Sequence, residues 1–441
     1  MSHEVLAVTG ATIVTCDAAM SVVRDGTMVV ADGRIVAVGP AGAVTVPAGA
    51  RIVDGRDRIL MPGLINMHCH AGDSLFRGLV EDLPLEPWLQ TVWKAERAIL
   101  TADTCRLGAR LGLAELALQG VTTVMDMFWH IDETVAAASE IGVRVATGGI
   151  FFDPPGMDGR DADGRRASAE GFCRRHAGNP FVFTGVMPHA TYTVGPASLL
   201  EAAEVARGHD GFFCTHAAET LAEQRTIEER YGARVIVHLD RLDLLGPRTV
   251  LAHCVHIDAE EIRLLAASGT HVVHNPMSNL KLASGFAPVP ALMAAGVNVS
   301  LGTDGAISGN DIDLWLALRL AATLHKAATG DAAAVPTAEA LRMATVNGAK
   351  ALRAEHRLGS LEAGKDADFI LVATDRIHAA PLFDPVTHLV YAAGKADVTD
   401  VFVAGRQLVD AGRLTTADVP ALIGEVHGLR AATLASIGRA G

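Results

Sequence analysis

Histidine and acidic residues stand at the ends of several short apolar runs in this chain, in types that suit a metal ion. His68 and His70 close the run that begins at Leu64. On a β-strand, residues i and i+2 point to the same face, so both imidazoles would converge on one point. His216 adds a third nitrogen and Asp304 an oxygen. Three nitrogens and one oxygen leave room for a water on a zinc ion, which lowers the pKa of that water from about 16 to about 7.

Two further residues are placed for proton transfer and charge stabilisation. Glu219 follows His216 by three positions, so a helical turn would put both side chains on one face. A carboxyl group beside an activated water is suited to proton shuttling. His253 ends another apolar run and could bond the water or steady a developing oxyanion.

Each of these residues also has a purely structural interpretation. His68 and His70 could be a satisfied polar pair at a strand end, and His253 a buried histidine with ordinary hydrogen bonds. Glu219 could be a helix N-terminal acid favoured by the dipole, and Asp304 a helix cap. The recurrence of such residues at several strand ends favours the metal site over these alternatives.

The elements that would position these residues follow a repeating pattern. Short apolar runs alternate with stretches of helical period between about 61 and 350. The strand candidates are 64–70, 121–127, 143–149, 181–187, 211–216, 249–254, 271–275 and 297–303. Eight such units predict an α/β fold, a (β/α)8 TIM-like barrel, whose chemistry lies at the C-terminal ends of the strands. The alternative is a doubly wound open sheet, but no G-x-G-x-x-G follows the first strand.

Both ends of the chain carry a different, strand-rich pattern. Strand-like runs at 28–30, 34–38 and 50–53 precede the barrel, and others at 368–372 and 400–405 follow it. We expect the two ends to pair into one small β-sandwich domain. The predicted parts are residues 1–60 for its N-terminal half, 61–359 for the catalytic barrel, and 360–441 for its C-terminal half with a terminal helix.

Composition narrows the class of protein. The 441 residues are 50% hydrophobic and 20% charged, with a net charge of −13 and no basic cluster. Binding to phosphate backbones needs clustered positive charge, so a nucleic-acid partner is not expected. No run is long and apolar enough to span a membrane. Six scattered cysteines and the lack of a signal-like start favour a reduced, cytoplasmic protein.

Several segments together resemble the amidohydrolase superfamily, and within it the aminohydrolase branch of adenosylhomocysteine/methylthioadenosine deaminases, guanine deaminases and s-triazine hydrolases. The segments are 61–70 (MPGLINMHCH), 73–93, 215–219 (THAAE), 252–254 (AHC), 275–282 (NPMSNLKL) and 301–305 (LGTDG). The resemblance spans nearly the whole chain and implies the barrel with its small terminal β-domain.

The resemblance also implies roles. One divalent ion, zinc with iron as the alternative, would be bound by His68, His70, His216 and Asp304. Asp304 would take a proton from the attacking water, Glu219 would protonate the ring nitrogen, and His253 would orient the nucleophile. Glu96 and His189 match positions that contact the nucleoside.

Aromatic residues and one departure concern the substrate. Trp129 follows the second strand and could stack on a planar ring, and Trp93 could cap the pocket, with core packing as the alternative for each. Adenosine-type members of the branch carry an arginine at the end of the third strand, where this chain has Gly149.

We therefore expect a metal-dependent hydrolytic deaminase that releases ammonia from a small aminated N-heterocycle, foremost an adenine nucleoside. The alternatives are a triazine-type chlorohydrolase or N-alkylaminohydrolase, and a guanine or pterin deaminase. A non-catalytic barrel that only binds ligands would show gaps in the ligand set, and the sequence has none. Relatives often form dimers or larger assemblies, so a homo-oligomer is a further expectation.

Overall fold

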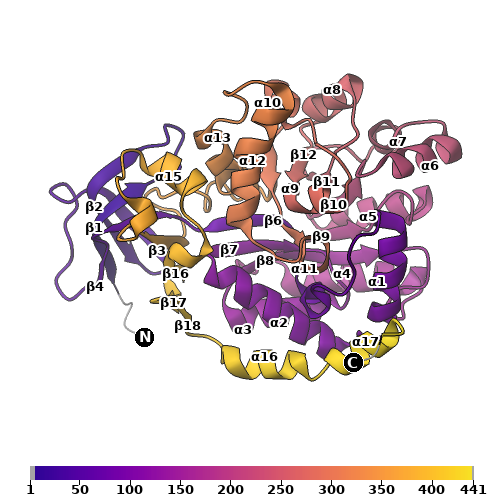
Figure 1. Cartoon of the computed structure of the whole chain (residues 1–441), viewed down its shortest axis with the longest axis horizontal. Coiled ribbons are helices and arrows are strands. Elements are labelled where there is room, and N and C mark those ends of the chain that lie inside the picture. Colours follow the sequence, from indigo (N-terminus) through magenta and orange to yellow (C-terminus); the bar gives the residue numbers. More distant parts are fainter. Residues whose placement is uncertain (1–4, 440–441) are drawn as a thin grey trace.

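The computed structural model describes residues 5–439, and a closed parallel barrel forms its larger part (Figure 1). Neighbouring strands pair in the order β13-β12-β11-β10-β9-β8-β7-β6-β14. Their bounds are β6 Leu64–His70, β7 Val121–Asp126, β8 Arg144–Phe151, β9 Val182–Pro188, β10 Phe212–Ala217, β11 Thr249–His253, β12 His271–His274, β13 Val299–Leu301 and β14 Asp304–Gly305. The predicted (β/α)8 barrel is confirmed, and each predicted strand lies within a few residues of the observed one.

The eighth strand of the barrel is split in two. β13 pairs with β12, and after a break at residues 302–303 β14 pairs with β6, which closes the ring. The break is bound to the first strand, because the Thr303 amide donates to the His68 carbonyl over 3.1 Å. A Cβ on Gly302 would lie 2.7 Å from the Cβ of His68, so only glycine lets the chain pass this closely. This contact brings Asp304 beside the histidines of β6.

Helices surround the barrel and fix the strand ends. They are α1 Leu85–Ile99, α2 Ala102–Leu118, α3 Ile131–Ile141, α4 Ala162–His176, α5 Pro196–Gly208, α6 Leu221–Tyr231, α7 Val235–Arg241, α8 Ala259–Ser268, α9 Pro276–Lys281, α10 Val289–Ala294, α11 Ala306–Gly309, α12 Leu314–Thr329, α13 Thr337–Met343 and α14 Val346–Ala351. A short 3-10 helix, η1 Ala71–Phe76, follows β6. Local sequence starts several of them, as where Thr101 forms a capping box with Thr104 before α2. Buried Ile65, Met125 and Val250 fill the barrel interior.

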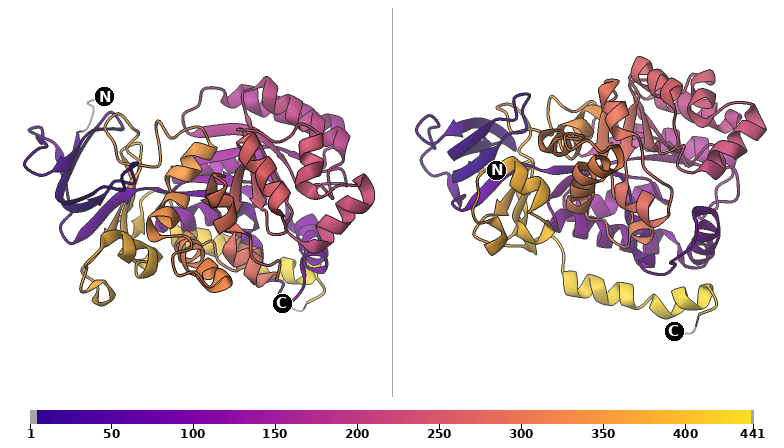
Figure 2. Two further views of the ribbon diagram at one scale, coloured as in Figure 1. Left: turned by 90° about the horizontal axis from the view of Figure 1, so that it is seen from above. Right: turned by 45° about the horizontal axis from the view of Figure 1, so that its top comes forward.

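The two ends of the chain meet in a second, mixed sheet beside the barrel (Figure 2). Its strands run in the order β18-β17-β16-β15-β5-β1-β2-β3, with β4 also paired to β1. The bounds are β1 Leu6–Val14, β2 Val22–Ala31, β3 Arg34–Pro40, β4 Arg51–Asp54, β5 Arg58–Pro62, β15 Phe369–Ala373, β16 Val398–Val403, β17 Arg406–Asp410 and β18 Arg413–Leu414. Asp32 and Gly33 both have positive φ, as the tight turn between β2 and β3 requires. The small domain built from both ends, expected from the sequence, is confirmed.

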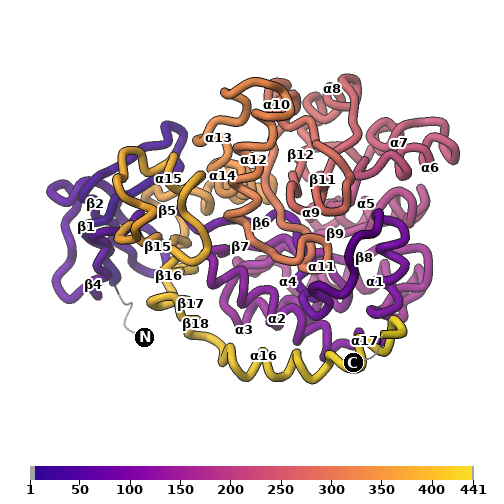
Figure 3. Tube along the Cα trace, viewed as in Figure 1, coloured from indigo at the N-terminus to yellow at the C-terminus, as the bar shows by residue number. Residues whose placement is uncertain are grey.

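The C-terminal segment differs from the single helix predicted for it. It forms α16 Val419–His427 and α17 Arg430–Ser436, with a break at Gly428 and Leu429. The tube view shows this segment running from the small domain along the base of the barrel to α1 (Figure 3). The remaining short elements are η2 Ile377–Ala379, α15 Pro385–Tyr391 and η3 Lys395–Asp397.

Two sequence-level expectations meet the limits of the described chain. The predicted small domain includes residues 1–4 and 440–441, which lie outside the described residues. Within residues 5–439, no helix is both long and apolar enough to cross a bilayer.

Candidate metal centre and active site

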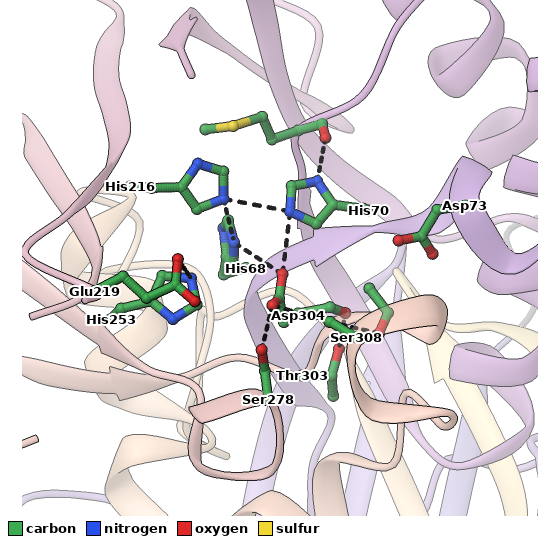
Figure 4. A network of polar contacts seen from close by, with 12 residues as sticks. His68, His70, Asp73, His216, Glu219, His253, Ser278, Thr303, Asp304 and Ser308 are labelled. Atoms are coloured by element: carbon green, nitrogen blue, oxygen red, sulfur yellow. Dashed lines mark hydrogen bonds and ion pairs between the residues drawn. The ribbon is translucent and has the colours of Figure 1, made fainter. Parts of the chain in front are cut away.

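Four side chains from three barrel strands meet at one point (Figure 4). His68 and His70 end β6, His216 lies on β10, and Asp304 begins β14. The His216 Nε2 atom lies 3.1 Å from Nε2 of His68 and 3.3 Å from Nε2 of His70. Oδ1 of Asp304 lies 3.3 Å from Nε2 of His68 and 3.1 Å from Nε2 of His70. Ligands about 2.0–2.1 Å from a tetrahedral zinc are separated by about 3.3 Å, so the spacing fits that ion.

The outer nitrogens of two histidines fix which nitrogen faces this point. Nδ1 of His70 lies 2.5 Å from the Met127 carbonyl, and Nδ1 of His216 lies 2.6 Å from the His189 carbonyl. A carbonyl can only accept, so both Nδ1 atoms carry the proton and both Nε2 lone pairs point inward. Converging lone pairs without a proton between them are the arrangement expected of metal ligands with supporting hydrogen bonds.

Asp304 is held as an anion. Burial would raise the pKa of its carboxyl, but neighbouring His68 and His70 hold that pKa well below its usual range. Its second oxygen, Oδ2, accepts hydrogen bonds from Ser278 Oγ at 2.6 Å and from Ser308 Oγ at 2.9 Å. One oxygen therefore faces the histidines while the other is fixed by two hydroxyl groups.

Glu219 and His253 lie together at the side of this cluster. Burial raises the pKa of the Glu219 carboxyl, which therefore holds a proton more readily than an exposed glutamate. Its Oε2 lies 3.9 Å from Nε2 of His253, and its Oε1 accepts from Ser284 Oγ at 3.3 Å. Nδ1 of His253 lies 2.8 Å from Oδ1 of Asn279, which directs Nε2 toward the pocket.

His253 also belongs to the wider group of ligand-type side chains. Its ligand atom and those of His68, His216 and Asp304 all lie within 4.8 Å of one another. We nevertheless assign the fourth ligand position to His70, because its Nε2 lies 3.1 Å from Asp304 and 3.3 Å from His216. His253 is then free to contact what binds next to the ion.

The backbone around the cluster is strained. Ala218, His253, Cys254 and Asp304 all have φ between 46° and 76°, which places them in the left-handed region. Each such non-glycine residue costs about 1 kcal/mol or more. Four of them adjoin or carry the polar side chains of the site, a concentration typical of functional centres.

A pocket opens onto this cluster and contains the predicted substrate residues. About 820 Å³ of space lies between side chains that include Glu96, Trp93, Trp129 and His189. Glu96 is 5% exposed, and burial raises its pKa to about 7. The Trp129 Nε1 donates to Oε2 of Glu96 at 3.4 Å, and Nδ1 of His189 lies 2.8 Å from Thr193 Oγ1. All four side chains are thus brought to the same cavity as the metal ligands.

Sequence reasoning did not assign several polar residues that support the site. They are Asp73, Glu223, Ser278, Asn279, Ser284 and Ser308. Ser278 and Asn279 lie in a segment that carried the family resemblance, so a signal for them was present. Glu223 lies one helical turn beyond Glu219 and accepts from its backbone amide at 2.8 Å, and the i, i+4 spacing could have indicated it.

Comparisons with known proteins agree with this geometry. A 5-methylthioadenosine/S-adenosylhomocysteine deaminase from Syntrophobacter fumaroxidans is 40% identical over 403 residues, covering 91% of this chain and 92% of the relative. The crystal structure of an adenosine deaminase from Xanthomonas campestris with bound zinc superposes with a TM-score of 0.95, at 36% identity over 98% of both chains. An atrazine chlorohydrolase from Arthrobacter aurescens, complexed with zinc, gives 0.89 at 27% identity over 96% of this chain and 99% of its own.

The family model described as "Amidohydrolase family" matches residues 59–408, which include every candidate metal ligand and the whole barrel. The fold, the position of the polar cluster and the family model lead to one assignment. The chain belongs to the amidohydrolase family.

Proposed function

We propose that this chain is a metal-dependent hydrolytic deaminase that releases ammonia from an adenine nucleoside. The observation that carries the proposal is the close set of His68, His70, His216 and Asp304, with buried Glu219 beside it in the same pocket. The related protein from Syntrophobacter, by its name a deaminase of adenine nucleosides, supports the substrate class.

Zinc is the ion that we propose for this site. Three imidazole nitrogens and one carboxylate oxygen are a donor set that zinc accepts, with a position left for water. The bound ion supplies an activated water at neutral pH and polarises the substrate. Zinc in the adenosine deaminase from Xanthomonas supports this choice.

The protein's own side chains carry the proton transfers of the reaction. Asp304 accepts a proton from the attacking water, and Ser278 and Ser308 keep that carboxylate oriented. Glu219, protonated because of its burial, gives its proton to the ring nitrogen next to the C–NH2 carbon. The C–N bond then breaks and the amino group leaves as ammonia.

Orientation of the reactants comes from the remaining residues. His253 hydrogen-bonds the incoming oxygen through Nε2, which its bond to Asn279 leaves unprotonated. Glu96 accepts hydrogen bonds from sugar hydroxyls, and His189 contacts the sugar from the other side of the pocket. Trp93 and Trp129 provide flat apolar walls for the rings.

The variant Glu219→Gln tests the proposal. The amide keeps the shape and the contact with Ser284 but cannot deliver the proton. We expect ammonia release from adenosine or 5′-methylthioadenosine to fall about 10²- to 10⁴-fold, with zinc content by elemental analysis unchanged. Glu229→Gln, on the exposed face of α6, is the matched control and should match the parent protein.

Two results would contradict the proposal. One is a Glu219→Gln protein that deaminates nucleosides at the parental rate. The other is a parent protein that leaves every nucleoside unchanged but releases chloride or alkylamine from a triazine, which would favour the hydrolase of the Arthrobacter type.

A further inference from the structure

The pocket that holds the candidate site has an unusual charge balance for a site that would accept anionic substrates. Four carboxyl side chains line it, from Asp73, Glu96, Glu219 and Asp304. No lysine or arginine lines it among residues 5–439. The cation proposed for the cluster is already surrounded by its own ligands, so it leaves no positive side chain for another part of the substrate.

The end of the pocket away from the metal ligands is apolar. The C–NH2 carbon of a substrate must lie beside Glu219 and the ligand cluster, so the sugar and its 5′ substituent extend toward the opposite wall. There α1 contributes Leu85, Leu89 and Trp93, and Phe152 closes the wall with its ring centroid 5.8 Å from that of Trp93. A group lying against this wall loses its water and gains no polar partner.

The cations near the pocket are already paired. Arg165 is 3% exposed, and its guanidinium donates to Asp158 at 3.1 and 3.2 Å and to the Ile150 carbonyl at 3.3 Å. It also stacks on the ring of Trp129, 5.7 Å from the centroid. Lys281 is bound by Glu81 at 3.0 Å and by the Ile307 carbonyl at 3.2 Å. Neither side chain lines the pocket.

The end of β8 cannot supply a cation either. A Cβ on Gly149 would lie 2.2 Å from the Cβ and 2.8 Å from the Cα of Ala169 on α4. The helix is packed directly on the strand at this position, so no longer side chain fits without moving α4. The absence of a guanidinium here is therefore built into the packing of two elements.

We propose that this pocket selects adenine nucleosides whose 5′ substituent is uncharged and discriminates against those that carry a carboxylate or phosphate there. The inference rests on the proposed function and refines its substrate class. An anion in the apolar half would lose its hydration without gaining a partner, and the carboxylates that line the pocket would repel it.

The test compares substrates that differ in charge but not in reach. 5′-Butylthioadenosine and S-adenosylhomocysteine have side chains of the same length, and only the second carries an ammonium and a carboxylate. We measure kcat/KM for ammonia release with the full, zinc-loaded chain. 5′-Methylthioadenosine serves as the small reference, and 5′-deoxyadenosine is paired with adenosine 5′-monophosphate for the phosphate case.

The inference expects 5′-butylthioadenosine to stay within about tenfold of the methylthio reference, and S-adenosylhomocysteine to fall about 100-fold or more below it. The monophosphate should fall at least as far below 5′-deoxyadenosine. If S-adenosylhomocysteine and its butylthio partner are used equally well, the inference is overturned. If both fall together, length and not charge decides, and the inference is again overturned.

Failure of the proposed function gives a different result. In that case none of the nucleosides releases ammonia, and the charge preference is then measured by calorimetric titration of the same pairs into the same protein. Binding of 5′-butylthioadenosine at least about 100-fold tighter than S-adenosylhomocysteine supports the inference. Equal binding, or no binding of either, overturns it.

Discussion

Glu223 is a buried residue whose ionisation sets a cost on the fold near Glu219. It is 4% exposed, and it accepts hydrogen bonds from the Glu219 amide at 2.8 Å and from Thr191 Oγ1 at 3.0 Å. Burial raises its pKa from 4.5 to about 7. The two bonds fix where α6 begins relative to β10, so Glu223 acts as a positioning residue for Glu219.

The variant Glu223→Gln should remove a pH-dependent loss of stability. The folded carboxyl binds its proton more tightly than the unfolded one, so stability falls as the pH rises from about 4.5 to about 7 and stays lower above that. The full loss is about 3 kcal/mol. Glutamine mimics the protonated form, since its oxygen accepts from Glu219 and its NH2 donates to Thr191.

Urea unfolding at pH 5 and pH 8 measures the effect. We expect the free energy of unfolding of Glu223→Gln, relative to the parent protein, to be about 2 to 3 kcal/mol more favourable at pH 8 than at pH 5. Exposed Glu229→Gln is the control and should show no such difference. A variant that follows the parent at both pH values would show that Glu223 titrates normally.

At the scale of elements, the packing of α4 on β8 is the contact most sensitive to one methyl group. Gly149→Ala should destabilise the protein by about 1 to 3 kcal/mol, because the new Cβ collides with Ala169. Gly171→Ala on α4 is the matched control, since its Cβ meets only the end of Arg175, and it should stabilise by up to about 1 kcal/mol.

A second substitution separates this collision from a general effect at the site. Ala169→Gly removes the opposing methyl group, so the double variant should regain part of the stability lost in Gly149→Ala, as measured by thermal unfolding. If the double variant is less stable than the sum of the two single changes, the steric explanation is wrong.

The sequence allowed most of these elements to be predicted, since strands buried on both faces are continuous apolar runs. The predicted strand at 64–70 coincides with β6, and the one at 211–216 is shifted by one residue from β10. β1 was missed, because Thr9 and Gly10 interrupt its apolar pattern. The split of the eighth strand was also missed, because it results from contact with His68, which is distant in sequence.

The site shows the same division. Metal ligands could be chosen because histidine and aspartate at strand ends have few structural uses, and the barrel requires those ends to meet. Ser278 and Ser308 could not be selected by residue type, because serine is common in turns and only the folded chain brings both to Asp304. Hydroxyl groups that support a ligand are therefore found by geometry and not by composition.

At the scale of the whole molecule, the proposed ion joins opposite parts of the barrel. Its ligands come from β6, β10 and β14, so binding should stabilise the closed ring against unfolding. Removal of the metal with a chelator should abolish ammonia release and lower the midpoint of thermal unfolding by several degrees. Added zinc should restore both.

Single variants make this prediction specific. His70→Asn should weaken the response of the unfolding midpoint to zinc, whereas exposed His356→Asn should respond like the parent protein. An unfolding midpoint that ignores both chelator and zinc would mean that the four side chains do not hold an ion in the folded state.

The pairing of β14 with β6 has one more consequence, for the order of events during folding. Asp304 reaches the histidines of β6 only when the last strand docks against the first and the ring is complete. An ion with a visible spectrum, such as cobalt, would therefore acquire its final colour at the moment of ring closure. Stopped-flow refolding in its presence would turn the candidate catalytic centre into a clock for the slowest topological step of the chain.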